Sequence, residues 1–227
     1  MNTSTHRCRG FTLLEILMAI SIFAIVISLA YGSYRATFLI IDTTEAQAEI
    51  YNKAGIAMNR LSNDLGSLYL GTSGFLQGKT QTLGNKEADT MRFTSTAHLV
   101  LNKNEQAAGY ATISYTVEED PETNTLRLFR LDRAFQPMES DEPELKKGLL
   151  LCDGLEEVQI IYHLRQGEQQ DNWDSQEIEK ADSNSPQLPD RIEISLLFMI
   201  PGTEEAQSIR FTTAVTFPGT APQGDTP

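Results

Sequence analysis

The chain has 227 residues, which is enough for one domain with an anchor or for two small domains, and its formal net charge is −13. Beyond residue 10 the imbalance is larger, because 16 basic residues there face 31 acidic ones. An acidic surface of this kind repels phosphate backbones and anionic headgroups, so the composition excludes a broad nucleic-acid interface and favours solubility.

A basic leader followed by an apolar run opens the chain. Residues 1–10 contain Arg7 and Arg9 and no acid, and residues 11–34 contain one charge, Glu15. At about 1.5 Å rise per residue, a helix over residues 11–34 spans roughly 36 Å, which is enough to cross a bilayer. Because basic flanks stay on the cytoplasmic side, we expect a single membrane pass with an exported C-terminal part.

The junction at Gly10 predicts where the chain is processed. An ordinary secretory signal is cut after its apolar region, at small residues, so that the apolar segment is lost. Here the basic leader ends at Gly10, directly before the apolar run. A cut between Gly10 and Phe11 would keep the apolar helix as the mature N-terminus. Only Cys152 would then remain, so no internal disulfide is expected.

Glu15 is a carboxylate inside an apolar helix, which costs about 2.5 to 3.5 kcal/mol on insertion scales. Cleavage would create a positive amino group at Phe11, and Glu15 of one subunit could pair with the Phe11 amine of its neighbour. Alternatively, Glu15 reaches toward headgroups or favours the positive helix N-terminus. The two interpretations differ in whether a neighbouring subunit supplies the counter-charge.

The helix is expected to continue as an amphipathic segment through residues 35–70. No proline interrupts residues 11–70, and apolar residues recur at three- and four-residue intervals. These are Ile50, Ala54, Ala57, Met58, Leu61, Leu65 and Leu68. One stripe must therefore be buried, and the following sheet is the expected partner. Gly66, Gly71 and Gly74 indicate where the helix gives way to a loop.

Alternating apolar residues predict a β-rich domain over residues 75–217, with about five to seven strands. The expected strands lie near residues 91–94, 113–117, 126–128, 158–164, 192–196 and 209–217. Asp120, Pro121 and Asn124 favour a turn between the second and third of these, so a hairpin is predicted there. Acidic or polar loops are expected near residues 139–147 and 166–189.

Few residues could support catalysis or metal binding. The three histidines are His6, His98 and His163, too few for a convincing triad or histidine-rich site, and the phase of His163 predicts that it faces solvent or a partner. Acidic side chains between residues 171 and 179 lack the spacing of a calcium loop and are interpreted as solvated charge; they are Asp171, Asp174, Glu177 and Glu179. We assign no catalytic or metal residue and expect no cofactor.

Three other features have structural interpretations. Residues 74–80 have three residues between their glycines where a phosphate-binding loop needs four, so we interpret them as a flexible loop with a solvated lysine. Cys152 is interpreted as a small apolar core residue. Trp173 either folds onto the core as a plug or stays exposed as an anchor for a neighbour, and we favour the plug.

Residues 9–15, Arg-Gly-Phe-Thr-Leu-Leu-Glu, resemble the type IV prepilin leader shared by pilins and by pseudopilins of type II secretion. In that family a membrane-embedded aspartyl peptidase cuts after the glycine and methylates the new amino group. The resemblance therefore implies cleavage between Gly10 and Phe11 and N-methylation of Phe11. It also implies that Glu15 takes part in subunit pairing, which aids extraction from the membrane.

Stretches of the β-rich domain resemble the J-type minor pseudopilin of the type II (general) secretory pathway. They are residues 113–115, 126–130, 149–155, 172–175 and 188–194. The resemblance implies a subunit without catalytic activity at the tip of a periplasmic pseudopilus that drives protein secretion across the outer membrane. The implied partners are I-type and K-type minor subunits, the major subunit, the prepilin peptidase and the inner-membrane assembly platform. The implied location is the bacterial inner membrane, with the C-terminal domain in the periplasm.

The expected fold is pilin-like α+β, a long N-terminal helix packed on an antiparallel sheet. It comprises a cleaved leader (1–10), the transmembrane half (11–34) and the amphipathic periplasmic half (35–70) of the helix, the β-rich domain (75–217) and a disordered tail (218–227). One alternative function is a minor pilin of a type IV pilus, serving assembly, adhesion or DNA uptake. A less favoured one is a membrane-tethered periplasmic binding protein or enzyme, which predicts a ligand-lined cleft.

Overall fold

The computed structural model describes residues 11–71, 73–98, 109–134, 148–164, 167–181, 188–200 and 207–217. The predicted leader (1–10), the acidic loop near 139–147 and the predicted tail (218–227) lie outside the described residues. The chain divides into two compact units, Met1–Gln47 and Ala48–Pro227, which are taken in turn.

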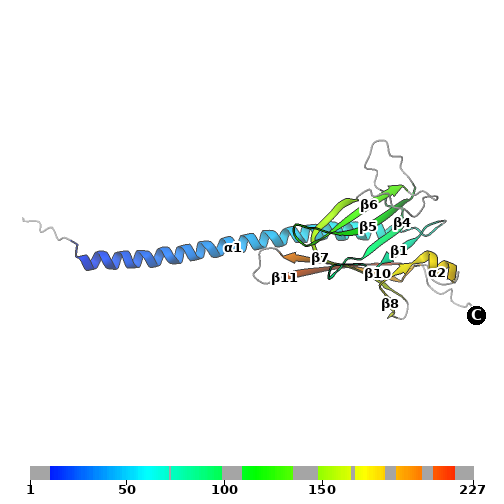
Figure 1. The fold of residues 1–227 in the computed structure, drawn as a ribbon. Helices are drawn as coiled ribbons and strands as arrows, with labels where there is room; N and C mark the ends of the chain where they lie inside the picture. The colour runs from blue at the N-terminus through cyan, green and yellow to red at the C-terminus, as the bar shows by residue number, and fades with distance from the viewer. Residues whose placement is uncertain are drawn as a thin grey trace, which may run out of the picture. The chain divides into compact units, whose positions relative to one another are not determined.

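One long helix, α1 (Leu13–Gly66), occupies most of the first unit and extends into the second (Figure 1). Thr12 caps its first turn, because the Thr12 hydroxyl oxygen accepts the Glu15 N–H at 3.3 Å. The helix ends at Gly66, the first of the three glycines predicted to stop it. A proline-free run with a good cap therefore forms a single helix of 54 residues, as the sequence predicts.

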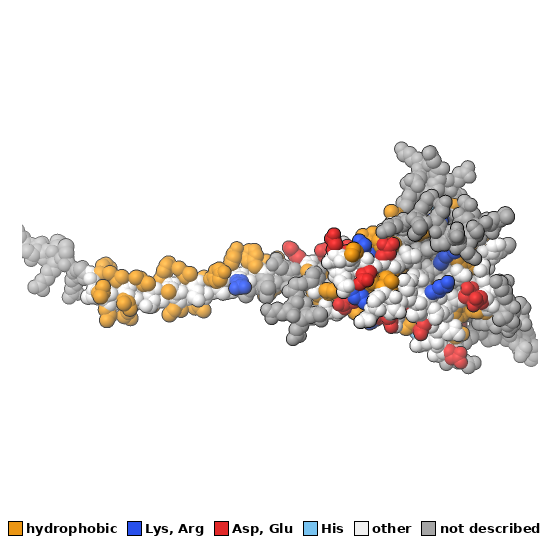
Figure 2. All heavy atoms as spheres, viewed as in Figure 1, with side chains coloured by type: hydrophobic (Ala, Val, Ile, Leu, Met, Phe, Trp, Pro, Cys, Tyr) orange, Lys and Arg blue, Asp and Glu red, His pale blue; other side chains and the backbone are white. Residues whose placement is uncertain are grey.

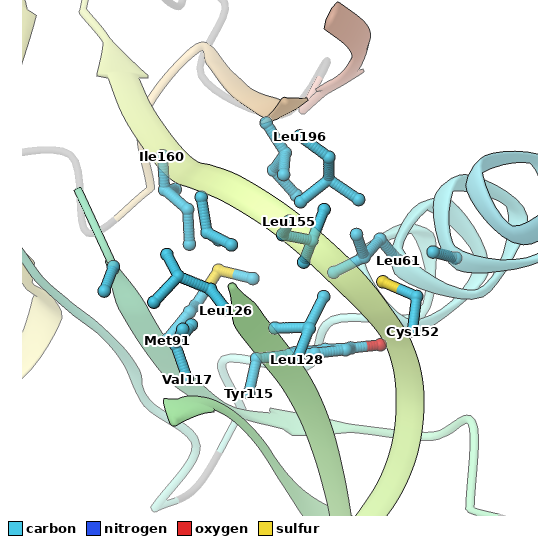
Figure 3. Packing of buried hydrophobic residues seen from close by; sticks show 14 of the residues in the cluster. Leu61, Met91, Tyr115, Val117, Leu126, Leu128, Cys152, Leu155, Ile160 and Leu196 are labelled. Carbon is cyan, nitrogen blue, oxygen red and sulfur yellow. The ribbon is translucent and has the colours of Figure 1, made fainter. Parts of the chain in front are cut away.

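The predicted apolar stripe of α1 is buried in the second unit. Its fully buried members are Ile50, Ala54, Ala57, Leu61 and Leu65, while Met58 and Leu68 are partly buried. Figure 3 shows Leu61 beside Leu155 and Cys152 of the sheet. Since burial of each large aliphatic side chain is worth about 1.5 to 3 kcal/mol, this stripe stabilises the docking of the helix on the sheet.

The second unit is built on a nine-stranded sheet whose named pairings are all antiparallel. Its order is β11-β10-β7-β6-β5-β4-β1-β9, and β8 pairs with β7 (Figure 1). The strands are β1 (Leu76–Lys79), β4 (Thr90–Ser95), β5 (Ala111–Glu119), β6 (Leu126–Ala134), β7 (Leu149–His163), β8 (Gln169–Gln170), β9 (Trp173–Asp174), β10 (Arg191–Ile200) and β11 (Gln207–Thr216). A two-stranded sheet, β2 (Thr82–Leu83) with β3 (Lys86–Glu87), and helix α2 (Ser175–Ala181) complete the described elements. The predicted α+β class is confirmed.

The predicted number of strands was too low. Six long strands, β4, β5, β6, β7, β10 and β11, match the six expected segments, but the described residues contain eleven strands. The additional ones are two to four residues long, too short for alternation to be seen in the sequence. The polar segment 166–189 was wrongly predicted to be a loop, because its described residues form β8, β9 and α2.

Residues 74–80 were also wrongly interpreted as a flexible loop. Residues Leu76–Lys79 form β1, which pairs with β4 on one side and β9 on the other, although Lys79 is exposed as expected. Gly78 permits a close contact there, since a Cβ at this position would lie 1.7 Å from the Tyr162 hydroxyl oxygen. The glycine that suggested a phosphate loop therefore serves packing of the sheet.

The predicted hairpin between residues 117 and 126 is confirmed. Strands β5 and β6 pair up to Glu119 and Leu126, and the Asp120 N–H donates to the Thr125 carbonyl oxygen at 2.8 Å. Asn124 takes a left-handed conformation with φ of 53°, which asparagine tolerates better than most residues. The turn residues thus set the register of two central strands.

The plug interpretation of Trp173 is confirmed, and the alternative of an exposed anchor is wrong. The Trp173 side chain is buried, and its ring stacks on Tyr162 with centroids 5.9 Å apart. Trp173 belongs to β9, the last strand along the sheet order, so it closes that end of the core.

Cys152 is a buried core residue, as predicted, and burial raises the pKa of its thiol to about 12. Since the thiolate is the reactive form, a Cys8→Ser chain should label with a thiol-specific reagent at pH 8 about a thousandfold more slowly when folded than in denaturant. The measurement is the rate of label incorporation by mass. Rapid stoichiometric labelling of the folded chain would contradict the burial of this thiol.

Candidate functional site

The N-terminal turn of α1 carries the residues predicted to be processed and to pair. Phe11 lies just before the helix and its side chain is 79% exposed. Glu15 lies four residues later, exposed, and is the acidic residue of the first turn. Gly10 lies outside the described residues. The structure therefore places Phe11 and Glu15 about one helical turn apart on the accessible end of the helix.

Thr12 is a part of this turn that the sequence analysis missed. Its hydroxyl accepts the Glu15 N–H, and its carbonyl oxygen accepts the Glu15 and Ile16 N–H groups at 3.1 and 3.3 Å. The sequence Thr12-Leu13-Leu14-Glu15 has the spacing of a capping box, a signal that could have located the start of the helix. Because the helix starts at Leu13, Phe11 stays outside its hydrogen-bond ladder.

Within the described part of the chain, Glu15 forms no ion pair with another side chain. The unpaired N–H groups at the start of α1 give that end a partial positive charge, which favours a carboxylate in the first turn. This contact is available to a single subunit. The described residues of its own chain supply no full counter-charge to Glu15.

Residues Leu13–Arg35 form the one stretch among the described residues that is long and apolar enough to cross a membrane. Figure 2 shows apolar side chains along this part of α1, and none of it is buried against the rest of the chain. The polar side chain of Ser21 donates to the Leu17 carbonyl oxygen at 2.8 Å, which satisfies the hydroxyl inside the helix. An exposed apolar surface of this extent needs lipid or neighbouring helices to cover it.

A buried polar cluster joins the end of α1 to the sheet. We call it the Asp64 cluster, and it consists of Arg60, Asp64, Tyr115 and Arg130. Asp64 is fully buried. Its carboxylate accepts the Tyr115 O–H at 2.6 Å, the Arg130 Nε–H at 2.6 Å, and a contact from Arg60 Nη2 at 2.5 Å. Three donors from the helix, β5 and β6 thus satisfy one carboxylate.

The protonation states of the Asp64 cluster follow from its burial and charges. Burial raises the pKa of Tyr115, and the charge of Asp64 raises it further, so the phenol stays neutral and donates. Burial lowers the pKa of Arg130, but its hydrogen bond and charge interaction with Asp64 outweigh this and leave the pKa raised. Arg130 therefore remains charged across the physiological pH range.

The cluster extends along β6 to Asp132 and His98. Arg130 Nη2 contacts Asp132 Oδ2 at 2.9 Å, and His98 Nδ1 lies 2.7 Å from Asp132 Oδ1. The His98 side chain is buried, although its sequence neighbours suggested no role for it. These contacts connect the residues after β4 to the Asp64 cluster, so the role of His98 is structural.

The other candidate polar residues also have structural partners. His163 lies opposite in phase to the core, as predicted, but it is only 12% exposed because Arg191 and Glu193 of β10 lie over it at 3.2 and 3.4 Å. Asp174 accepts the Gln176 and Glu177 N–H groups and so caps α2, which corrects its interpretation as solvated charge. Among the described residues no group of three His, Cys, Asp or Glu side chains could hold a metal ion.

Asp89 is a buried carboxylate held by backbone groups. Its Oδ2 accepts the Ile160 N–H at 2.8 Å and its Oδ1 accepts the Gln81 N–H at 3.3 Å. Burial raises the pKa of Asp89 to about 6, against the opposing effect of these two hydrogen bonds. The protonated form is therefore more favourable in the folded protein than in the unfolded chain.

Asp89 should consequently make the stability of the protein fall as pH rises. Its folded pKa of about 6 lies above the ordinary value of 3.8, so its stabilising contribution is complete below about pH 4 and is lost by about pH 6. The loss is on the order of 3 kcal/mol, and an Asp89→Asn chain should lack it. The measurement is the difference in unfolding free energy between the two chains in urea at several pH values. A difference that does not change between pH 4 and pH 6 would contradict the assignment.

Comparison with known families adds to this geometry. The prokaryotic N-terminal methylation motif matches residues 5–31, which include the predicted cleavage point and most of the apolar segment. The family described as "Type II secretion system (T2SS), protein J" matches residues 33–200, well over half of the chain. The chain belongs to the type II secretion system protein J family.

The predicted resemblance to a J-type pseudopilin is confirmed, and the chain is a minor pseudopilin of the type II secretion system. Its family consists of structural secretion subunits and is not a family of known enzymes. One chain of the crystal structure of the GspK–GspI–GspJ complex from the type 2 secretion system of enterotoxigenic Escherichia coli aligns with a TM-score of 0.41. That alignment has 16% identity and covers 74% of this chain and 98% of that chain. A comparison with curated proteins found no match.

Proposed function

We propose that this minor pseudopilin is cut between Gly10 and Phe11, N-methylated on Phe11, and inserted into a periplasmic pseudopilus through its apolar helix. The observation that supports this most directly is the methylation motif over residues 5–31 together with the cap at Thr12. Because α1 begins at Leu13, Phe11 precedes the hydrogen-bonded helix and is accessible to a prepilin peptidase.

Glu15 is the proposed pairing residue for the neighbouring subunit. Four residues along a helix correspond to about 6 Å, so a neighbour displaced by roughly one turn brings its Phe11 amine next to Glu15. N-methylation keeps the positive charge of that amine. In the low dielectric of a membrane the attraction is stronger than in water, which offsets the cost of placing the carboxylate there.

The proposed location is the bacterial inner membrane, crossed once by residues 11–34, with the leader (1–10) in the cytoplasm. The proposed periplasmic part comprises residues 35–70, in which the helix runs to Gly66, the β-rich domain (75–217) and the predicted tail (218–227). The second compact unit begins at Ala48, so part of the periplasmic half of the helix belongs to the core of that domain. This division of the chain suits an anchor that carries a domain on the exported side.

The proposed partners are other pseudopilins, namely the I-type and K-type minor subunits and the major subunit, at the tip of the filament. The solved complex of GspK, GspI and GspJ contains three subunits of one such system, which supports a minor-subunit assembly. The prepilin peptidase would process the precursor, and the inner-membrane assembly platform would receive it.

Gly10→Val is expected to block processing, because a branched side chain next to the scissile bond cannot occupy the position of a glycine. The readout is the intact mass of the subunit, which should retain residues 1–10 and gain no methyl group. Gly32→Ala is the matched control, since a Cβ at position 32 meets no atom within 4 Å, and it should be processed normally. A Gly10→Val chain that stays uncut yet supports normal secretion would refute the proposed route.

Glu15→Gln should leave cleavage and methylation intact and lower incorporation into the pseudopilus. Each 1.4 kcal/mol of lost pairing corresponds to about a tenfold drop in association. Incorporation is measured by cross-linking of the mature subunit to its neighbours in membranes. Glu45→Gln removes the same charge from an exposed position of α1 and should have no such effect. Equal incorporation of both variants would show that Glu15 only stabilises its own helix.

A further inference from the structure

Strand β11 is the long open edge of the nine-stranded sheet. The sheet order begins with β11, and β10 is its one neighbour among the described strands. All ten residues of β11 pair with β10 in a regular antiparallel register without a shift. The opposite end of the sheet order is the two-residue strand β9, so the two edges are very unequal.

Half of the backbone groups of β11 face away from the sheet. The Phe217 N–H, which continues the register of β11, donates to the Asp190 carbonyl oxygen at 3.0 Å. Backbone groups of successive residues alternate in direction, so the odd-numbered residues of β11 face β10 and the even-numbered ones face outward. The outward-facing residues are Ser208, Arg210, Thr212, Ala214 and Thr216. Within the described part of the chain no backbone group pairs with them.

The edge lacks the devices that normally prevent another strand from pairing. Such edges are usually short, bulged, interrupted by proline or charged. Strand β11 contains no proline and no bulge, and its single charge, Arg210, is held in two contacts by Glu157 of β7 at 2.7 and 2.8 Å. Its three threonines, with Ile, Phe and Val, strongly favour extended backbone. The edge is therefore competent to receive a further strand.

One side of β11 is also left incompletely covered. Ile209, Phe211 and Val215 point to the side of the core but are only partly buried. Tyr51 of α1 lies edge-on to Phe211 with ring centroids 5.2 Å apart, yet its side chain is 58% exposed. A strand added beside β11, with apolar side chains on this side, would bury these groups. The other side of β11 presents small or polar side chains, so an alternating partner is required.

The charge and composition of the candidate segments decide which of them could pair with the edge of β11. A second copy of this chain has the same net charge of −13 and would be repelled, and Glu204 and Glu205 lie three and two residues before β11 in the sequence. The chain's own residues 218–227 contain three prolines, which cannot donate to a ladder. We propose that the edge of β11 accepts an extended segment of another polypeptide, with apolar residues at alternate positions and lysine or arginine at its ends.

Hydrogen exchange on the full chain in detergent micelles tests this proposal. The probe is a synthetic peptide, Lys-Thr-Val-Thr-Val-Thr-Val-Lys, and the control peptide has proline in place of each threonine. At a peptide concentration about ten times its Kd, exchange of the outward amides of β11 should slow about tenfold. The proline peptide should give no slowing. The Ala214→Pro chain, which lacks one outward N–H, should bind more weakly, whereas Ala214→Ser should bind normally.

Other occupants of the edge have distinct signatures. Protection of β11 that grows with protein concentration in the absence of peptide would make a second copy the occupant and overturn the proposal. Faster exchange at β11 after deletion of residues 218–227 would identify the tail as the occupant, with the same consequence. Absence of protection at millimolar peptide, or equal protection by the proline peptide, would show that β11 does not accept a strand.

Discussion

Replacing Asp64 by alanine is expected to lower the free energy of unfolding by about 3 to 5 kcal/mol, because it breaks a buried ion pair and leaves the Arg130 Nε–H and the Tyr115 hydroxyl without their acceptor. Arg130 is buried and its Nε–H donates to Asp64 at 2.6 Å, while Tyr115 donates its hydroxyl to the same carboxylate. Without the carboxylate, the guanidinium and the phenol lose their acceptor in a place that water does not reach. The loss exceeds that of any single surface ion pair in the protein.

Urea unfolding of the full chain in detergent, followed by fluorescence of the single tryptophan, would measure the effect of Asp64→Ala. Asp153→Ala is the matched control, since Asp153 pairs with Lys53 at 2.8 Å with both side chains well exposed, and it should cost less than about 1 kcal/mol. The double variant Asp64→Leu with Arg130→Met should recover part of the stability, because it removes the buried Asp64–Arg130 ion pair as a unit while Asp132 keeps its contact with His98. If Asp64→Ala costs no more than Asp153→Ala, the cluster does not hold the helix to the sheet.

Replacing Trp173 by alanine is expected to cost about 3 to 5 kcal/mol, the usual range for removing a large buried aromatic side chain. The Trp173 ring is buried and stacks on Tyr162, which is itself among the largest fully buried side chains. The change opens a cavity at the end of the sheet, where β9 pairs with β1. Neighbouring contacts depend on this packing, since the Leu76 N–H donates to the Ser175 hydroxyl at 2.9 Å.

Circular dichroism in urea is the suitable measurement for Trp173→Ala, because the variant has no tryptophan. Trp173→Phe keeps an aromatic ring in the same place and should recover part of the stability. Leu149→Ala, at a side chain that is 62% exposed, should change stability by no more than about 0.5 kcal/mol. A Trp173→Ala chain as stable as Leu149→Ala would show that the ring contributes little to the core.

Much of the fold could be predicted because its elements are long and periodic. The stripe from Ile50 to Leu65 repeats over several turns of α1, and six strands alternate over six or more residues each. The hairpin at Asn124 followed from turn chemistry that acts within a few residues. The short strands β1, β8 and β9 could not be predicted in this way, since two to four residues show no period and depend on the neighbour they pair with.

The side-chain contacts of the Asp64 cluster could likewise not be predicted from local sequence pattern. Arg130 shares the phase of Leu126 and Leu128 on β6, so strict alternation already pointed a charge toward the core. What the sequence could not supply was the partner, because Asp64 lies 66 residues away on the helix. The contact between His98 and Asp132 could not be predicted from the sequence for the same reason.

Local sequence pattern was enough to predict the junction at Gly10, the apolar span, the charge at Glu15, the helical stripe and the long strands. Each of these depends on residues within one or two turns or along one strand, so their spacing is enough to predict them. Three features became visible only in the folded chain: Trp173 is a plug, Asp64 is satisfied from three elements, and β11 is left as an open edge. Those outcomes depend on which distant segments meet, and that is settled by packing and pairing of the whole sheet rather than by local pattern.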